Sequence, residues 1–201
     1  MPTEGPPSSV LDDNGARASS DGGPRTALRG VAGHFLALSL ALLGGILGIL
    51  GAAIQEIRSG GLLLLPFIGA PIIEELLKPT GVYILLVRWP RLLRGQLYTA
   101  LLAALSGLAF GVVEAVVYVN VYVSDPPDWF VTYRFTLPLL VHATASFIVG
   151  LGISQGLLSW ARGGSPLPRA TRNFYLAAIA LHATFNIVAT ALVIASVFED
   201  V

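Results

Sequence analysis

Long apolar runs separated by short polar links make up most of the chain. Five of these runs reach the roughly 20 residues that a helix needs to cross a bilayer, and they cover residues 31–54, 62–87, 97–123, 135–160 and 174–198. The links are too short to hold a further folded unit. The pattern therefore predicts an all-α fold, a polytopic transmembrane helical bundle of about five spanning helices, in one domain that covers residues 25–201.

The first 24 residues show a different pattern. They are rich in Pro, Ser, Gly and Asp and carry almost no large apolar side chains. Such a segment cannot bury enough apolar surface to offset the conformational entropy that ordering would cost. We expect residues 1–24 to form a disordered tail.

Composition agrees with the pattern and limits the chemistry. The chain is 54% hydrophobic and 12% charged, with a positive mean hydropathy, which is typical of a membrane protein. Its formal net charge of zero gives a nucleic-acid partner no electrostatic support. Because the chain contains no cysteine, it has no thiol nucleophile, and His and carboxylate side chains must hold any metal.

The arginines outside the apolar runs are divided unevenly between the two sides of the predicted bundle. Arg58 and Arg134 fall on one side. Nine fall on the other side: Arg17, Arg25, Arg29, Arg88, Arg91, Arg94, Arg162, Arg169 and Arg172. Short links rich in Lys and Arg face the cytoplasm. We therefore expect an integral protein of a prokaryotic cell membrane, with the N-terminus cytoplasmic and the C-terminus outside.

The second apolar run carries charges near its middle. Glu74, Glu75 and Lys78 lie within it, although an ionisable group at such depth costs roughly 2.5–3.5 kcal/mol on insertion. On a helix, residues three and four apart are neighbours, so the Lys78 ammonium can reach either carboxylate. We expect a structural ion pair at Lys78, which leaves one negative charge without a partner.

Prolines interrupt the same run. There are three of them: Pro66, Pro71 and Pro79. Each lacks the backbone N–H that a helix uses for its hydrogen bonds. Together they predict kinks, or a broken segment, around a cavity.

Polar side chains recur at membrane depth in the later runs. Glu114 lies in the third run, His142 in the fourth, and His182 and Asn186 in the fifth. Groups on separate helices can satisfy one another only by converging in the bundle interior. His182 and Asn186, one turn apart, project from one helix face. The candidate catalytic residues are Glu74, Glu75, Glu114, His142, His182 and Asn186.

Two chemical routes remain open for this set. Glu114, His142 and His182 could ligate a divalent metal such as zinc, which activates water. Without a metal, a carboxylate in a low-dielectric site could act as general base, while His or Asn186 stabilises an oxyanion. Both routes lead to hydrolysis by activated water. Serine chemistry is less favoured, because the serines of the third and fourth runs lie in rows of small packing residues.

Four segments, each in its own apolar run, occur in a recognisable order. They are Glu74-Glu75-Leu76-Leu77-Lys78, Phe110-Gly111-Val112-Val113-Glu114, His142, and His182-Ala183-Thr184-Phe185-Asn186. This order resembles the PrsW family of intramembrane proteases, in a superfamily with the CAAX prenyl proteases and bacteriocin-immunity-type membrane proteins. The resemblance covers about residues 66–190. Glu114 stands where the CAAX branch has His, and Lys78 where that branch commonly has Arg, which favours the PrsW branch.

The resemblance implies a peptidase that cuts a membrane-anchored protein within the lipid bilayer. The glutamate pair of the first motif supplies the base that activates water, and the four motif helices form the catalytic core. Glu114 and His142 lie nearer the predicted outer ends of their spans than the glutamate pair does. We therefore expect cleavage beside the outer membrane boundary of the substrate.

Two other classes of protein use similar residues. A transporter or proton relay also contains buried acids, histidines and proline-broken helices, but no internal repeat is visible in the chain. A haem protein could use the two intramembrane histidines as axial ligands. That interpretation leaves the glutamates and Lys78 without a role.

Overall fold

The computed structural model describes residues 24–58 and 65–199. The predicted disordered tail, residues 1–24, lies outside these ranges except for Pro24, which begins the first helix. The described residues form helices joined by short loops and include no strand. The predicted all-α class is therefore confirmed.

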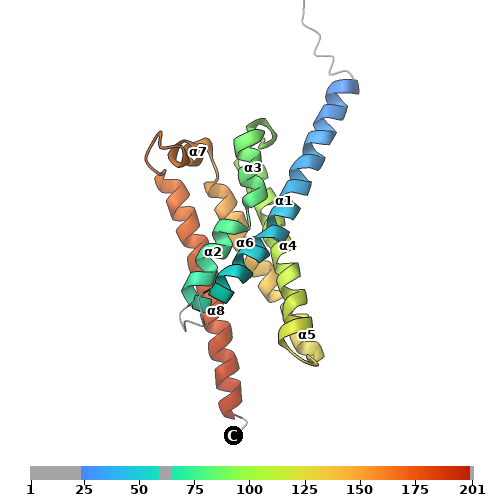
Figure 1. Cartoon of the computed structure of the whole chain (residues 1–201), viewed down its shortest axis with the longest axis vertical. Helices are drawn as coiled ribbons and strands as arrows, with labels where there is room; N and C mark the ends of the chain where they lie inside the picture. The colour runs from blue at the N-terminus through green and yellow to red at the C-terminus, as the bar shows by residue number, and fades with distance from the viewer. Residues whose placement is uncertain (1–23, 59–64, 200–201) are drawn as a thin grey trace, which may run out of the picture.

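The helices labelled in Figure 1 are α1 Pro24–Arg58, α2 Ala70–Leu77, α3 Thr80–Arg88, α4 Gln96–Val117, α5 Asp128–Arg134, α6 Leu137–Gly152, α7 Gln155–Ala161 and α8 Arg169–Glu199. A π-helical turn, Leu65–Gly69, leads into α2, and a second one, Tyr118–Tyr122, extends α4. A 3-10 turn, Pro90–Leu92, follows α3.

Four stretches among the described residues are long and apolar enough to cross a membrane. They are Gly30–Gly51, Gln96–Tyr122, Asp128–Gly152 and Arg169–Leu192. Each overlaps one of the predicted spans, the first, third, fourth and fifth in chain order. Large apolar side chains remain exposed along them, as at Phe35 and Leu101. Such surface suits lipid, where a helix satisfies its own backbone hydrogen bonds.

The predicted second span is not one continuous helix. It consists of α2 and α3, which meet at Pro79, where the backbone leaves the helical conformation. Figure 1 shows the two helices end to end beside α1, running back towards the end of the bundle where α7 lies. The missing N–H of proline explains a break at this position. At a rise of about 1.5 Å per residue, residues 65–88 are still long enough to cross a bilayer.

Two hydroxyl groups bond the backbone carbonyls at this break. The Thr80 hydroxyl donates to the Leu77 carbonyl oxygen at 2.5 Å, and the Ser106 hydroxyl of α4 donates to the Lys78 carbonyl oxygen. A helix end away from water needs such partners for its last carbonyls. The contact with α4 therefore fixes Lys78 at a defined depth in the bundle. It also gives Ser106 a structural role.

The predicted fourth span is shifted in the structure. The sequence predicts a span over about residues 135–160, whereas the apolar stretch of the structure begins at Asp128 and ends at Gly152. It bends between α5 and α6, where Pro138 occupies the first turn of α6 and needs no hydrogen-bond partner for a backbone N–H. The separate helix α7 begins with Ser154, whose side chain accepts a hydrogen bond from the Leu157 backbone N–H.

The helix α4 is central to the packing. It contacts α1 on one side and α6 on the other, while α8 packs against α6 and α2. Glycines permit the close approaches. A Cβ on Gly81 of α3 would overlap the Leu40 carbonyl of α1, and a Cβ on Gly107 of α4 would overlap the His142 carbonyl of α6. These helices therefore meet backbone to backbone, which carries the polar side chains of different helices into the same interior region.

Candidate active site

The ammonium of Lys78 lies at the centre of the buried polar cluster. Lys78 follows the last turn of α2, and its side chain is fully buried. Its Nζ lies 2.7 Å from Glu75 Oε1 and 3.2 Å from Glu74 Oε2. A third contact, 2.7 Å long, joins Nζ to His142 Nδ1 on α6. One cation therefore contacts both carboxylates of α2 and an imidazole of a second helix.

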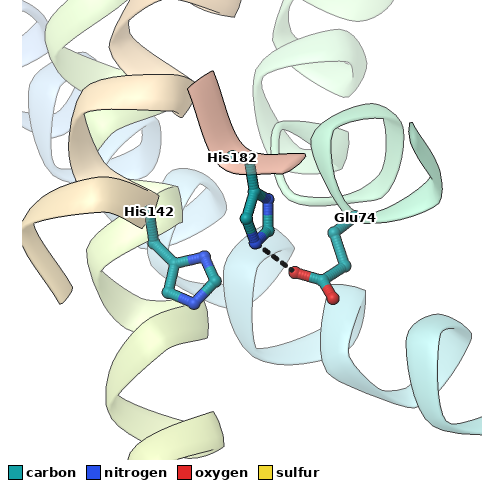
Figure 2. Close-up of side chains that lie close together, drawn as sticks. All are labelled: Glu74, His142 and His182. Atoms are coloured by element: carbon teal, nitrogen blue, oxygen red, sulfur yellow. Dashed lines mark ion pairs between the residues drawn. The ribbon is translucent and has the colours of Figure 1, made fainter. Parts of the chain in front are cut away.

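His182 reaches the same carboxylates from α8. Its Nδ1 lies 2.9 Å from Glu75 Oε1, and its Nε2 lies 3.8 Å from Glu74 Oε2. The imidazole is buried. Because a carboxylate only accepts hydrogen bonds, Nδ1 carries the proton and donates to Glu75. The Nε2 of His182 faces Glu74, and Figure 2 marks this contact between the two side chains.

His142 has the mirrored arrangement. Its Nε2 lies 2.8 Å from Glu114 Oε2 on α4, while its Nδ1 faces the Lys78 ammonium. An ammonium can only donate, so Nδ1 accepts from Lys78 and the imidazole proton lies on Nε2, donating to Glu114. Each histidine thus donates one N–H to a carboxylate and turns its other nitrogen towards the interior of the cluster.

Packing between α4 and α6 fixes the orientation of His142. The Phe110 ring lies against the imidazole, with centroids 5.3 Å apart. A Cβ on Gly111 would come within 2.9 Å of His142 Cδ2, so no larger residue leaves room for the ring in this position. The imidazoles of His142 and His182 meet edge to face with centroids 4.9 Å apart. Residues of the second sequence motif therefore form the wall that places the third.

Arg134 belongs to the site, although the sequence pattern placed it in an outer link. It is the last residue of α5, and its guanidinium lies 2.9 Å from Glu114 Oε2. The side chain is only 11% exposed, and that of Glu114 is 20% exposed. The guanidinium also stacks over the Tyr118 ring at 3.7 Å from its centroid. A basic residue shortly before the run that carries His142 was the only signal in the sequence.

Glu74, His142 and His182 form a group that could hold a metal ion. One ligand atom from each residue lies within 4.8 Å of the others, and all three residues are buried. Figure 2 shows their side chains pointing towards one another from different helices. The sequence prediction placed Glu114 in the metal set. In the structure Glu114 lies on the far nitrogen of His142, and Glu74 is the carboxylate of the shared group.

The chemistry of these donors fits a divalent metal. One carboxylate and two imidazoles are the ligands that catalytic zinc uses, with one position left for water. Glu74 Oε2 and Glu75 Oε2 are buried and accept no hydrogen bond from the described residues, although Glu74 Oε2 keeps its ion-pair contact with Lys78. Buried carboxylate oxygens need a donor or a cation. The set therefore offers ligand atoms that protein groups do not fully satisfy.

Asn186 lies on the same helix as His182. It follows His182 by one turn on α8 and is half-buried. Six sequence-predicted residues are thus placed as follows. The Lys78 ammonium contacts Glu74, Glu75 and His142, and His182 contacts both glutamates. Glu114 bonds the other nitrogen of His142, and Asn186 lies one turn beyond His182 on α8.

The described residues thus form an all-helical bundle, with helices long enough to cross a membrane, around a buried glutamate–histidine group. A model of the family "PrsW family intramembrane metalloprotease" matches residues 25–199. The chain therefore belongs to the PrsW family of intramembrane metalloproteases and is a peptidase embedded in a membrane. The match includes the first span, which lay outside the sequence resemblance. Comparisons with curated proteins and with solved structures gave no significant match.

The contact between Arg134 and Glu114 predicts thermodynamic coupling. We expect Arg134→Met to lower stability by about 1.5–3 kcal/mol, the contribution of a hydrogen bond to a charged group. Adding Glu114→Gln to this variant should restore at least about 1 kcal/mol of the lost stability, because the effects of substitutions at two residues in contact do not add. Unfolding of the two single variants and the double variant in detergent measures this. Arg88→Met, at an exposed position, is the control, and additive effects would contradict the pairing.

Proposed function

We propose that the chain hydrolyses a peptide bond of a membrane-anchored protein with water activated between the glutamate pair and the two histidines. The observation that carries the proposal is the shared arrangement of His142 and His182. Each imidazole donates one N–H to a carboxylate and directs its other nitrogen towards Glu74 or Lys78. This is the arrangement in which a carboxylate orients a metal-ligating histidine.

Glu74, His142 and His182 would hold a divalent metal such as zinc. Their mutual spacing and burial support this choice, as does the open hydrogen-bonding capacity of Glu74 Oε2. Glu75 and Glu114 would then orient the histidines from outside the ligand set. When bound, the metal acts as a Lewis acid that polarises the scissile carbonyl and acidifies water. Because Lys78 now contacts His142 Nδ1, its ammonium has to withdraw from that nitrogen before His142 can ligate.

Glu75 is the proposed general base. Its Oε1 accepts from Lys78 and His182, while its Oε2 is buried without a hydrogen-bond donor among the described residues. One oxygen thus holds the carboxylate in position and the other remains able to take a proton from water. The same group then returns that proton to the leaving amine. The Asn186 amide, one turn from His182, would stabilise the developing oxyanion.

A Glu75→Gln variant tests this division of roles. The side-chain carbonyl of the introduced amide can still accept from Lys78 and His182, so we expect metal content and melting temperature to stay near those of the wild type. Loss of the base should reduce cleavage of a tagged single-span protein by about 10²–10⁴-fold. Glu74→Gln is the matched control, since it should lose metal as well as activity. An active Glu75→Gln enzyme would exclude Glu75 as the base.

Substitution of Lys78 tests the competition between the ammonium and a metal. Lys78→Met leaves two buried carboxylates without their cation, and breaking a buried pair costs about 3–5 kcal/mol. We expect a lower melting temperature in the presence of a chelator and a recovery when zinc is added, because the metal replaces the lost charge. Thermal unfolding with and without zinc measures both. A variant that zinc does not stabilise would argue against the proposed ligand set.

The position of the site supports cleavage on the outer side of the membrane. Arg134, at the end of α5, reaches into the site, and α5 lies at the end of the bundle opposite α7 and the arginine-rich links (Figure 1). If those links face the cytoplasm, as their charge predicts, the site opens towards the outer boundary. Mass spectrometry of the products locates the cut. A scissile bond near the cytoplasmic boundary would contradict this orientation.

A further inference from the structure

Besides the active site, the bundle contains a cavity of about 380 Å³ between α3, α7 and α8. Its wall is apolar, and Leu76, Leu86 and Leu157 contribute to it. The Tyr83 and Tyr175 hydroxyls, 2.6 Å apart, join α3 to α8 beside it. The active-site residues do not line this cavity. It is therefore a separate feature of the bundle, and α7, which lies at one end of the bundle (Figure 1), forms part of its wall.

The size of the cavity limits what it can hold. A helix about 10 Å wide that rises about 1.5 Å per residue occupies roughly 120 Å³ per residue, so only about one turn of a substrate helix would fit. A methylene group has about the volume of a water molecule, roughly 30 Å³ in the liquid. The cavity therefore has room for about a dozen methylene groups. This matches most of one lipid acyl chain.

The charge around the cavity indicates the headgroup. Arg172 lines it and is exposed, and the exposed Trp160 lies on the same wall. The neighbouring links add Arg88, Arg162 and Arg169, and the sequence has no acidic residue between Lys78 and Glu114 or between Asp128 and Glu199. A membrane-surface cluster of arginines attracts anionic lipids, and a guanidinium pairs well with a phosphate.

We propose that this cavity is a binding site for an anionic phospholipid. One acyl chain lies in the cavity against Leu76 of α2 and Leu157 of α7, and the phosphate of the headgroup pairs with Arg172. Trp160 lies at the level of the headgroups, as interfacial tryptophans do. The lipid fills the space where α3 and α8 are joined by the Tyr83–Tyr175 hydrogen bond. Binding at this site does not depend on the catalytic roles proposed above.

Trp160 can report the bound lipid directly. In a Trp89→Phe/Trp129→Phe background, Trp160 is the only tryptophan of the chain, since the sequence has three. The full-length protein is reconstituted in bilayers that contain either brominated phosphatidylglycerol or brominated phosphatidylcholine, both of which quench tryptophan. We expect half-maximal quenching at an approximately fivefold lower mole fraction of the anionic lipid, the ratio that corresponds to about 1 kcal/mol per basic residue.

Two pairs of variants separate the site from general surface charge. Arg172→Gln should abolish the preference, whereas Arg94→Gln, which removes an exposed arginine away from the cavity, should retain it. Leu157→Phe narrows the cavity and should also abolish the preference, whereas Leu101→Phe, at an exposed position of α4, should not. Equal quenching of Trp160 by both lipids in the Trp89→Phe/Trp129→Phe background would overturn the proposal. So would an equal loss in both arginine variants, or a preference that survives Leu157→Phe.

Discussion

The buried ammonium of Lys78 is the interaction on which the rest of the site depends. Two adjacent carboxylates buried inside a membrane bundle would repel each other. Lys78 contacts both of them and His142 as well. Its own position is set by the break at Pro79 and by the bond from Ser106 to its carbonyl. The helix break at Pro79 therefore positions the Lys78 ammonium, whose charge stabilises the two buried glutamates.

From this centre the polar contacts pass outward through four further helices, α4, α5, α6 and α8. Glu75 leads to His182 on α8, and His142 leads through Glu114 on α4 to Arg134 on α5. Each contact satisfies a group that lipid could not, so the helices have a reason to converge beyond their apolar packing. The same contacts leave the inner nitrogen of His182 facing Glu74 and that of His142 facing Lys78. The hydrogen bonds and ion pairs that satisfy the buried polar groups are thus the same contacts on which the proposed chemistry depends.

Physical cost explains what the sequence could predict. The lengths of the apolar runs predict the all-α class. The cost of exposing ionisable side chains to lipid predicts that the glutamates of the second run converge with the two histidines. The break at Pro79 follows from its missing N–H. The role of Arg134 could not be predicted, because the sequence pattern placed it in an outer link, whereas the fourth stretch begins at Asp128 and Arg134 contacts Glu114. The sequence predicts Glu114 in the metal group, whereas the structure groups Glu74 with the two histidines. The difference depends on which nitrogen of His142 faces inward, and packing of the ring against Gly111 sets that orientation.

X-ray absorption at the zinc edge tests the central claim most directly. The claim is that Glu74, His142 and His182 form one ligand set inside the membrane. For the purified wild-type protein loaded with zinc, it predicts one ion per chain with two imidazole nitrogens at about 2.0–2.1 Å and carboxylate oxygen at about 2.0–2.2 Å. His182→Ala should lose one imidazole from that spectrum. A protein that cleaves its substrate without stoichiometric metal, or zinc bound without imidazole, would contradict the claim.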